Sequence, residues 1–261
     1  MTALLALSVG NSRTQLGRFE DVATGLAASE QVENEHTDLI VERAAIHFRE
    51  LADEEAVVAL ASVNDPVADS LVARLEGRLG VTVRRVGRDL APPISTRLDR
   101  GVRTGVDRLL CAAAAYRTLK QACVVVDCGT AVTIDFVDGI GTFHGGAIAP
   151  GAQLQLDSLH SRTAALPSVR FREPDDEACG RNTEQAMLQG VAHGIRGLVQ
   201  RLVERYAEAQ GAFPMVVATG GDAPALLHDM EFIDRIVPDL VLMGIAAAVE
   251  ADLVDEPASD E

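Results

Sequence analysis

The sequence predicts an α/β protein of two domains with a cleft between them. Apolar, strand-like runs alternate with segments of helical periodicity along the chain. A strand, a small polar turn and a second strand occur near the start of each half, at Leu4–Phe19 and at Val124–Phe136. The length of 261 residues suits one large or two small domains. We therefore expect domains at 1–118 and 119–254, followed by an acidic tail at 255–261.

The first half alternates between strands and helices, and its breaks have recognisable causes. Asp65 is placed to cap a helix that has Pro66 at its first position. The pair Pro92-Pro93 favours a loop. The expected elements are strands at Ala3–Leu7, Gln15–Phe19, Val57–Ala61 and Val81–Val86, helices at Thr37–Leu51, Pro66–Gly77 and Gly105–Lys120, and a loop over Asp89–Val102.

The second half begins with a strand hairpin and ends with an apolar helix. Between them lie a glycine-dense segment, Gly141–Pro150, and a polar, irregular one, Thr163–Arg181. The expected regular elements are the hairpin from Val124, helices near Gln153–Leu159, at Asn182–Gln210 and at Leu240–Leu253, and a strand at Met215–Ala218.

Composition excludes several classes of function. A formal net charge of −16 repels nucleic acid and anionic membranes, although acidity of this kind also serves solubility alone. Aromatic residues make up 3% and tryptophan is absent, which disfavours a base-stacking surface. The four cysteines form no CxxC pair, and neither a signal peptide nor a bilayer-spanning run is seen. We expect a cytoplasmic protein without nucleic-acid or membrane partners.

The segment VVVDCGTAVTID, from Val124 to Asp135, is the strongest local signal for a ligand site. Asp127 ends an apolar strand and could hold a cation. Gly129 lets backbone approach a ligand, and the turn amides with the Thr130 hydroxyl can donate to phosphate oxygens. An ordinary hairpin with a polar turn explains the segment equally well.

A similar arrangement opens the chain and shifts the balance toward a nucleotide site. A short apolar strand runs into the small polar turn Ser8–Thr14, and a second strand follows. One glycine-containing turn is weak evidence, whereas two in matching places are stronger. Two such hairpins facing one another could hold the phosphates of a nucleotide in a cleft between domains.

Other polar segments permit both a structural and a functional interpretation. Asp107, in the first turn of its helix, is stabilised there by the helix dipole, or it serves as a general base with Arg108 holding an anionic group. The Thr219–Ala223 turn, with two adjacent glycines, suits close approach of a nucleoside or phosphate, or is a plain loop capped by Asp222. Thr183 could donate to a substrate or serve as the N-terminal cap of a helix.

Together these segments resemble the type III pantothenate kinases, a family of the sugar kinase/actin superfamily of two-domain phosphotransferases. The resemblance implies two ribonuclease H-like domains and ATP-dependent phosphorylation of pantothenate to 4'-phosphopantothenate, the first step of coenzyme A synthesis. It covers nearly the whole chain and rests on SVGNSRTQLG, GVDR, DCGTAVTID, GGAIAPG, the Thr163–Pro167 stretch, NTEQAMLQG, ATGGDA and PDLVLMGI.

The resemblance also implies roles for single residues. Asp107 would accept the proton of the pantothenate hydroxyl, and Asp127 would hold a monovalent cation, K⁺ or NH₄⁺. Mg²⁺ would accompany ATP, and the protein would be a homodimer. The implied pantothenate pocket consists of Gly105, Val106, Asp107, Arg108 and Thr183, and the implied ATP contacts are Ser8, Val9, Gly10, Asn11, Ser12, Arg13, Thr14, Gln15 and Thr130.

Two positions depart from the family pattern. The first turn of the family normally begins with Asp, and here that residue is Ser8. A Tyr usually precedes the GxDR motif, where this chain has Leu98. A hydroxyl cannot replace a carboxylate in balancing Mg²⁺ or phosphate charge. The alternatives to an active pantothenate kinase are therefore a non-catalytic ligand-binding or regulatory relative, and a kinase for another small hydroxylated acceptor.

Overall fold

A computed structural model describes residues 1–51 and 56–255. The predicted acidic tail, 255–261, lies outside these residues except for Asp255. Contacts divide the chain into two units, and the last helix groups with the first unit rather than with the predicted second domain. Unit 1 consists of 1–95, 99–117 and the segment from Asp239, and unit 2 consists of 96–98 and 118–238.

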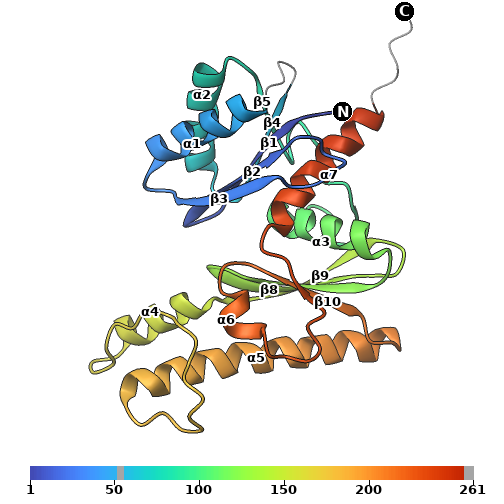
Figure 1. The fold of residues 1–261 in the computed structure, drawn as a ribbon. Coiled ribbons are helices and arrows are strands. Elements are labelled where there is room, and N and C mark those ends of the chain that lie inside the picture. The colour runs from blue at the N-terminus through green and yellow to red at the C-terminus, as the bar shows by residue number, and fades with distance from the viewer. Residues whose placement is uncertain (52–55, 256–261) are drawn as a thin grey trace, which may run out of the picture. The chain divides into compact units, whose positions relative to one another are not determined.

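The sheet of unit 1 has five strands in the order β3-β2-β1-β4-β5 (Figure 1). The first hairpin has the predicted antiparallel pairing, in which Leu4 lies opposite Phe19 and Val9 opposite Thr14. Strand β4 runs parallel to β1, and β5 runs parallel to β4. The strands are β1 (Leu4–Val9), β2 (Arg13–Phe19), β3 (Ala28–Glu33), β4 (Val57–Ser62) and β5 (Val83–Arg85).

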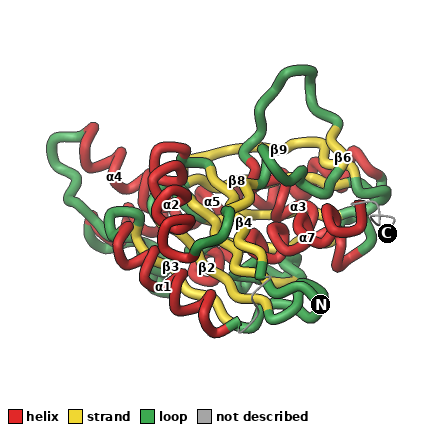
Figure 2. The backbone as a smooth tube through the Cα atoms, turned by 90° about the horizontal axis from the view of Figure 1, so that it is seen from above, coloured by secondary structure: helices red, strands yellow, loops and turns green. Residues whose placement is uncertain are grey.

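Helices cover both faces of this sheet, because its parallel strands are apolar on both sides. Helices α1 (Thr37–Glu50) and α2 (Asp65–Leu79) lie side by side over one face (Figure 2). Helix α7 (Leu240–Asp255) packs on the other face together with Leu110 of α3 (Val106–Leu119). A Cβ at Gly244 of α7 would lie 2.6 Å from the Leu110 carbonyl carbon of α3. The two helices are therefore so close at this point that only glycine fits at position 244.

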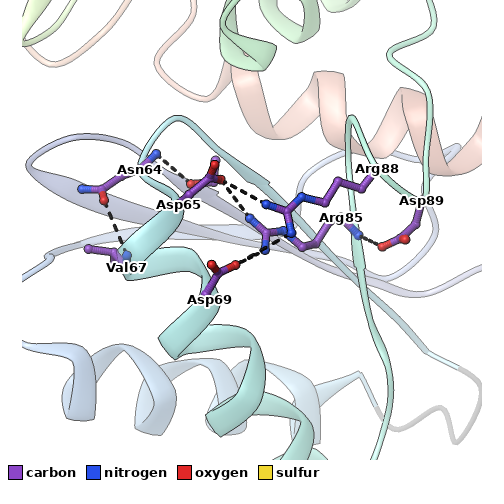
Figure 3. A network of polar contacts seen from close by, with 8 residues as sticks. Asn64, Asp65, Val67, Asp69, Arg85, Arg88 and Asp89 are labelled. Atoms are coloured by element: carbon purple, nitrogen blue, oxygen red, sulfur yellow. Dashed lines mark hydrogen bonds and ion pairs between the residues drawn. The ribbon is translucent and has the colours of Figure 1, made fainter.

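The beginning of α2 corrects one prediction. Asn64, not Asp65, is the capping residue, and its Oδ1 accepts from Val67 N at 3.5 Å. The Asp65 carboxylate instead pairs with the Arg85 guanidinium at 3.1 Å and with Arg88 (Figure 3). Asp and Asn are both good caps, so local sequence could not separate these neighbours.

The sheet of unit 2 has six strands in the order β11-β10-β7-β8-β9-β6. The hairpin predicted from Val124 forms with Asp127 opposite Thr133. Strands β10 and β11 run parallel to β7 and to one another, whereas β9 is antiparallel to β8. The strands are β6 (Ser95–Thr96), β7 (Cys123–Cys128), β8 (Ala131–Val137), β9 (Thr142–Pro150), β10 (Met215–Thr219) and β11 (Arg235–Ile236).

The core of unit 2 lies between one face of this sheet and three helices. The long helix α5 (Thr183–Gln210) contributes a buried stripe that includes Leu188, Ile195 and Val203. Helices α4 (Ala152–Arg162) and α6 (Ala223–Leu227) pack against the same core. Asn182 caps α5 by accepting from Gln185 N at 2.9 Å.

Both units share one topology, an antiparallel three-stranded meander extended by parallel strands from its first strand. This agrees with the predicted α/β class and with the repeated strand–turn–strand motif. The sequence analysis did not foresee β3, β6 or β11. Within the described residues, every helix is too short or too polar to cross a bilayer.

Candidate functional site

The first polar turn is fixed by two asparagines outside it. Asn34 Nδ2 donates to Gly10 O at 2.8 Å and to Asn11 O at 3.2 Å, and Asn34 Oδ1 accepts from the Thr14 hydroxyl at 2.7 Å. Asn64 Nδ2 also donates to Asn11 O at 3.4 Å. The backbone of the turn is thereby held in one conformation, and sequence analysis identified neither asparagine.

The predicted phosphate-binding residues of this turn fall into two groups. Asn11, Ser12 and Arg13 are exposed at its tip. Thr14 is fully buried, and Gln15 on β2 is 9% exposed. Gln15 Nε2 donates to Asp239 Oδ1 at 2.6 Å, so its amide already holds a carboxylate.

Asp107 lies in the same unit, near the carboxyl ends of β1 and β4. It is in the first turn of α3, and Arg108 N donates to its Oδ1 at 2.8 Å. A Cβ at Gly105 would lie 2.5 Å from that oxygen and 3.6 Å from Val63 Cγ1. Val63 N in turn donates to Val9 O at 3.1 Å. Unit 1 therefore brings Asp107 to the end of the sheet where the first polar turn lies.

The second polar turn, Cys128-Gly129-Thr130 between β7 and β8 of unit 2, is packed tightly against the Gly220-Gly221 turn. Asp222 N donates to Cys128 O at 3.0 Å. Gly220 has a φ of 90°, and a Cβ there would lie 2.5 Å from Cys128 O and nearer still to Asp127 Oδ1. The glycine is thus required by its left-handed backbone and by the Asp127 carboxylate beside it.

Negative charge gathers around Cys128. Burial raises the pKa of this thiol, and the carboxylates of Asp127 and Asp222 raise the pKa further. Both acids therefore act on one turn, and the thiol between them stays protonated.

The remaining residues of unit 2 that the sequence singled out have the following places. Thr130 is exposed, and its carbonyl accepts from Gly151 N at 3.0 Å. Thr183 begins α5 and lines a cavity of about 670 Å³ together with Leu154, Leu159 and Met187. Leu98 lies beside Gly145 of β9, where an added Cβ would be 3.2 Å from Leu98 Cδ2.

The fold defines the class of protein. Two solved structures share it: the ethanolamine utilization protein EutJ from Carboxydothermus hydrogenoformans (TM-score 0.54, 14% identity, 94% of this chain and 90% of that one) and MreB 5 of Spiroplasma citri bound to AMPPNP (TM-score 0.53, 10% identity, 98% and 99%). The chain has the fold of the actin and sugar kinase superfamily.

Sequence comparison then gives the family. The family model described as type III pantothenate kinase matches residues 4–205. The type III pantothenate kinase of Dehalococcoides mccartyi (strain CBDB1) is 32% identical over 93% of this chain and 93% of its own length. That of Akkermansia muciniphila is 36% identical over 82% and 91%. The chain belongs to the type III pantothenate kinase family.

Proposed function

We propose that this protein phosphorylates pantothenate at the expense of ATP, as the first step of coenzyme A biosynthesis. The main support is family membership together with a carboxylate, Asp107, at the end of the sheet where the first polar turn lies. Nothing in the comparisons favours the non-catalytic alternative. In an active enzyme, a group other than Ser8 supplies the charge that Asp supplies in the family.

In the proposed reaction, Asp107 receives the proton of the pantothenate hydroxyl as its oxygen attacks the γ-phosphorus of ATP. The new O–P bond forms while the bond to the β-phosphate oxygen breaks, and ADP leaves. A single carboxylate beside the acceptor hydroxyl suffices, because phosphoryl transfer depends mainly on positioning and charge stabilisation. Gly105, Val106 and Arg108, with Thr183, are the proposed pantothenate contacts.

The first polar turn, Ser8–Thr14, together with Gln15 and with Thr130 of the second turn, is the proposed binding site for ATP phosphates. Asn34 supports this assignment because it holds the turn through Gly10, Asn11 and Thr14. Because the turn is already ordered before the ligand binds, binding loses little conformational entropy there.

Two cations complete the proposal. Ser8, near the end of β1, offers a hydroxyl oxygen, and Asp239, which accepts from Gln15 of β2, offers a carboxylate. Oxygen atoms are the ligands that Mg²⁺ prefers. When bound with ATP, Mg²⁺ neutralises part of the charge of the phosphates. Asp127, backed by Gly220, is the proposed ligand of a monovalent cation, K⁺ or NH₄⁺.

We also propose that the protein is a cytoplasmic homodimer. Apolar side chains line the cavity between α4 and α5 that contains Thr183, and Leu154 at its rim is 47% exposed. A second copy of the chain would cover such a surface. Sedimentation of the purified protein at micromolar concentration measures the oligomeric state directly.

A coupled assay for ADP, with pantothenate, ATP, Mg²⁺ and K⁺, tests the function. Pantothenate-dependent ADP release is expected from the wild type, and Asp107→Asn should lower kcat by about 10²–10⁴-fold while the unfolding transition stays unchanged. Asp99→Asn, an exposed acid on the preceding loop, is the matched control. Saturable pantothenate binding without turnover would identify the non-catalytic alternative, and turnover only with other hydroxylated acceptors would identify a different kinase.

A further inference from the structure

Ser8 stands on a defined face of the first sheet. Leu4 and Ala6, which precede it at intervals of two along β1, pack on the face covered by α7. Side chains at intervals of two point to the same face of a strand, so Ser8 faces the same way. Directly opposite Ser8 on β2 is Gln15. Side chains of directly opposed residues share a face, with Cβ atoms about 4.5–5.5 Å apart.

Gln15 connects this position to a carboxylate from the other end of the chain. Its side chain is nearly buried, and its Nε2 donates to Asp239 Oδ1 at 2.6 Å. Asp239 precedes α7, and Met243 N of that helix donates to Asp239 O at 3.2 Å. The carboxylate is therefore anchored through its side chain and its backbone, above the direct neighbour of Ser8.

We propose that Asp239 supplies the negative charge that Ser8 lacks and is the acidic side chain of unit 1 that holds the Mg²⁺ of bound ATP. The inference rests on the proposed function. Mg²⁺ keeps several waters and takes one or two carboxylates beside the substrate phosphates. A single oriented carboxylate therefore suffices, and Gln15 provides the orientation by holding Oδ1.

The competing explanation is that the Gln15–Asp239 hydrogen bond only ties α7 to the sheet. Asp239→Asn separates the two explanations, because the amide oxygen of Asn can still accept from Gln15 Nε2 while the charge is lost. If the hydrogen bond only joins α7 to the sheet, Asp239→Asn would leave nucleotide binding unchanged. If Asp239 is instead a ligand of Mg²⁺, removing its charge would weaken Mg²⁺-dependent nucleotide binding.

The experiment measures binding of AMPPNP, a non-hydrolysable ATP analogue, by calorimetry with Mg²⁺ and again with EDTA. Asp239→Asn should weaken binding about tenfold or more with Mg²⁺ and change it less than about twofold with EDTA. Ser8→Asp in the Asp239→Asn background returns a carboxylate to position 8 and should restore the Mg²⁺-dependent affinity. Glu20→Gln is the matched control, since exposed Glu20 follows β2 at the opposite end of the hairpin.

Each outcome decides the inference. Loss in Asp239→Asn together with recovery in the double variant supports it. Unchanged Mg²⁺-dependent binding in Asp239→Asn overturns it and leaves the proposed function standing, provided that the wild type binds. Loss without recovery also overturns it, because the charge would then not be interchangeable with one at position 8. A wild type without Mg²⁺-dependent binding would overturn both proposals.

Discussion

Replacing Gly220 by alanine should disturb the second polar turn far more than the same change at Gly221. Gly220 has a φ of 90°, and an added Cβ would lie 2.5 Å from the Cys128 carbonyl oxygen and 2.6 Å from its carbon. The added Cβ would also collide with the Asp127 carboxylate. An added Cβ at Gly221 meets no atom within 4 Å, and its φ is not left-handed.

The size of the effect follows from two costs. A left-handed conformation costs a residue with a side chain about 1–2 kcal/mol. Overpacking a tight site costs about 1–3 kcal/mol more. Gly220→Ala should therefore lower the free energy of unfolding by about 2–5 kcal/mol, whereas Gly221→Ala should change it by no more than about 0.5 kcal/mol.

Urea unfolding, followed by circular dichroism, measures the free energy of unfolding of both variants. The slope of that free energy against urea concentration should be the same in the variants as in the wild type. The part of the cost that arises from the carboxylate can be isolated in a cycle with Asp127→Ala, where Gly220→Ala should become less damaging by about 0.5 kcal/mol or more. Equal unfolding midpoints for the two glycine variants would refute the reasoning. So would strict additivity of Gly220→Ala with Asp127→Ala, which would leave only the backbone clash.

Two further predictions concern acid sensitivity and thiol chemistry. Burial raises the pKa of Asp138, but hydrogen bonds from His144 and from the amides of Thr142 and Ile140 outweigh it and hold the pKa below its usual range. Its stabilisation is thus complete above the unfolded pKa of about 3.9 and is lost as pH falls through the folded pKa. Asp138→Asn should accordingly flatten the fall in urea midpoint between about pH 5 and pH 2, and an unaltered profile would contradict this. Burial raises the pKa of Cys123 to about 12 and raises that of Cys128 also, so iodoacetamide at pH 8 should label exposed Cys179 in the native protein, as mass spectrometry of the peptides would show. Rapid native labelling of Cys128 would count against the buried turn.

Segments with a strong local pattern were predicted well. The helix expected at Thr37–Leu51 is observed at Thr37–Glu50, and the strand expected at Val57–Ala61 is observed at Val57–Ser62. Strand β3 was missed because its sequence, ASEQVE, buries only Val32 at the sheet edge. A strand so weakly buried has little apolar pattern to detect.

The parts of the site that sequence could not predict all depend on distant pairs. Asn34 holds residues more than twenty positions earlier, and Gln15 meets Asp239 at a separation of 224 residues. The need for glycine at Gly220 likewise arises in part from Asp127 and Cys128, which lie on β7, far from Gly220 in the sequence. The polar turns themselves were predicted from local residue types, because small polar residues after a strand are visible without tertiary structure.

The return of α7 to the first sheet has a consequence for biosynthesis. Leu242, Ile245 and Val249 fill one face of a sheet whose strands leave the ribosome long before them. The face of this sheet that α7 covers therefore stays exposed until translation is almost complete. A prematurely terminated chain would expose this apolar surface, which chaperones and proteases recognise, so quality control can distinguish truncated products from finished ones.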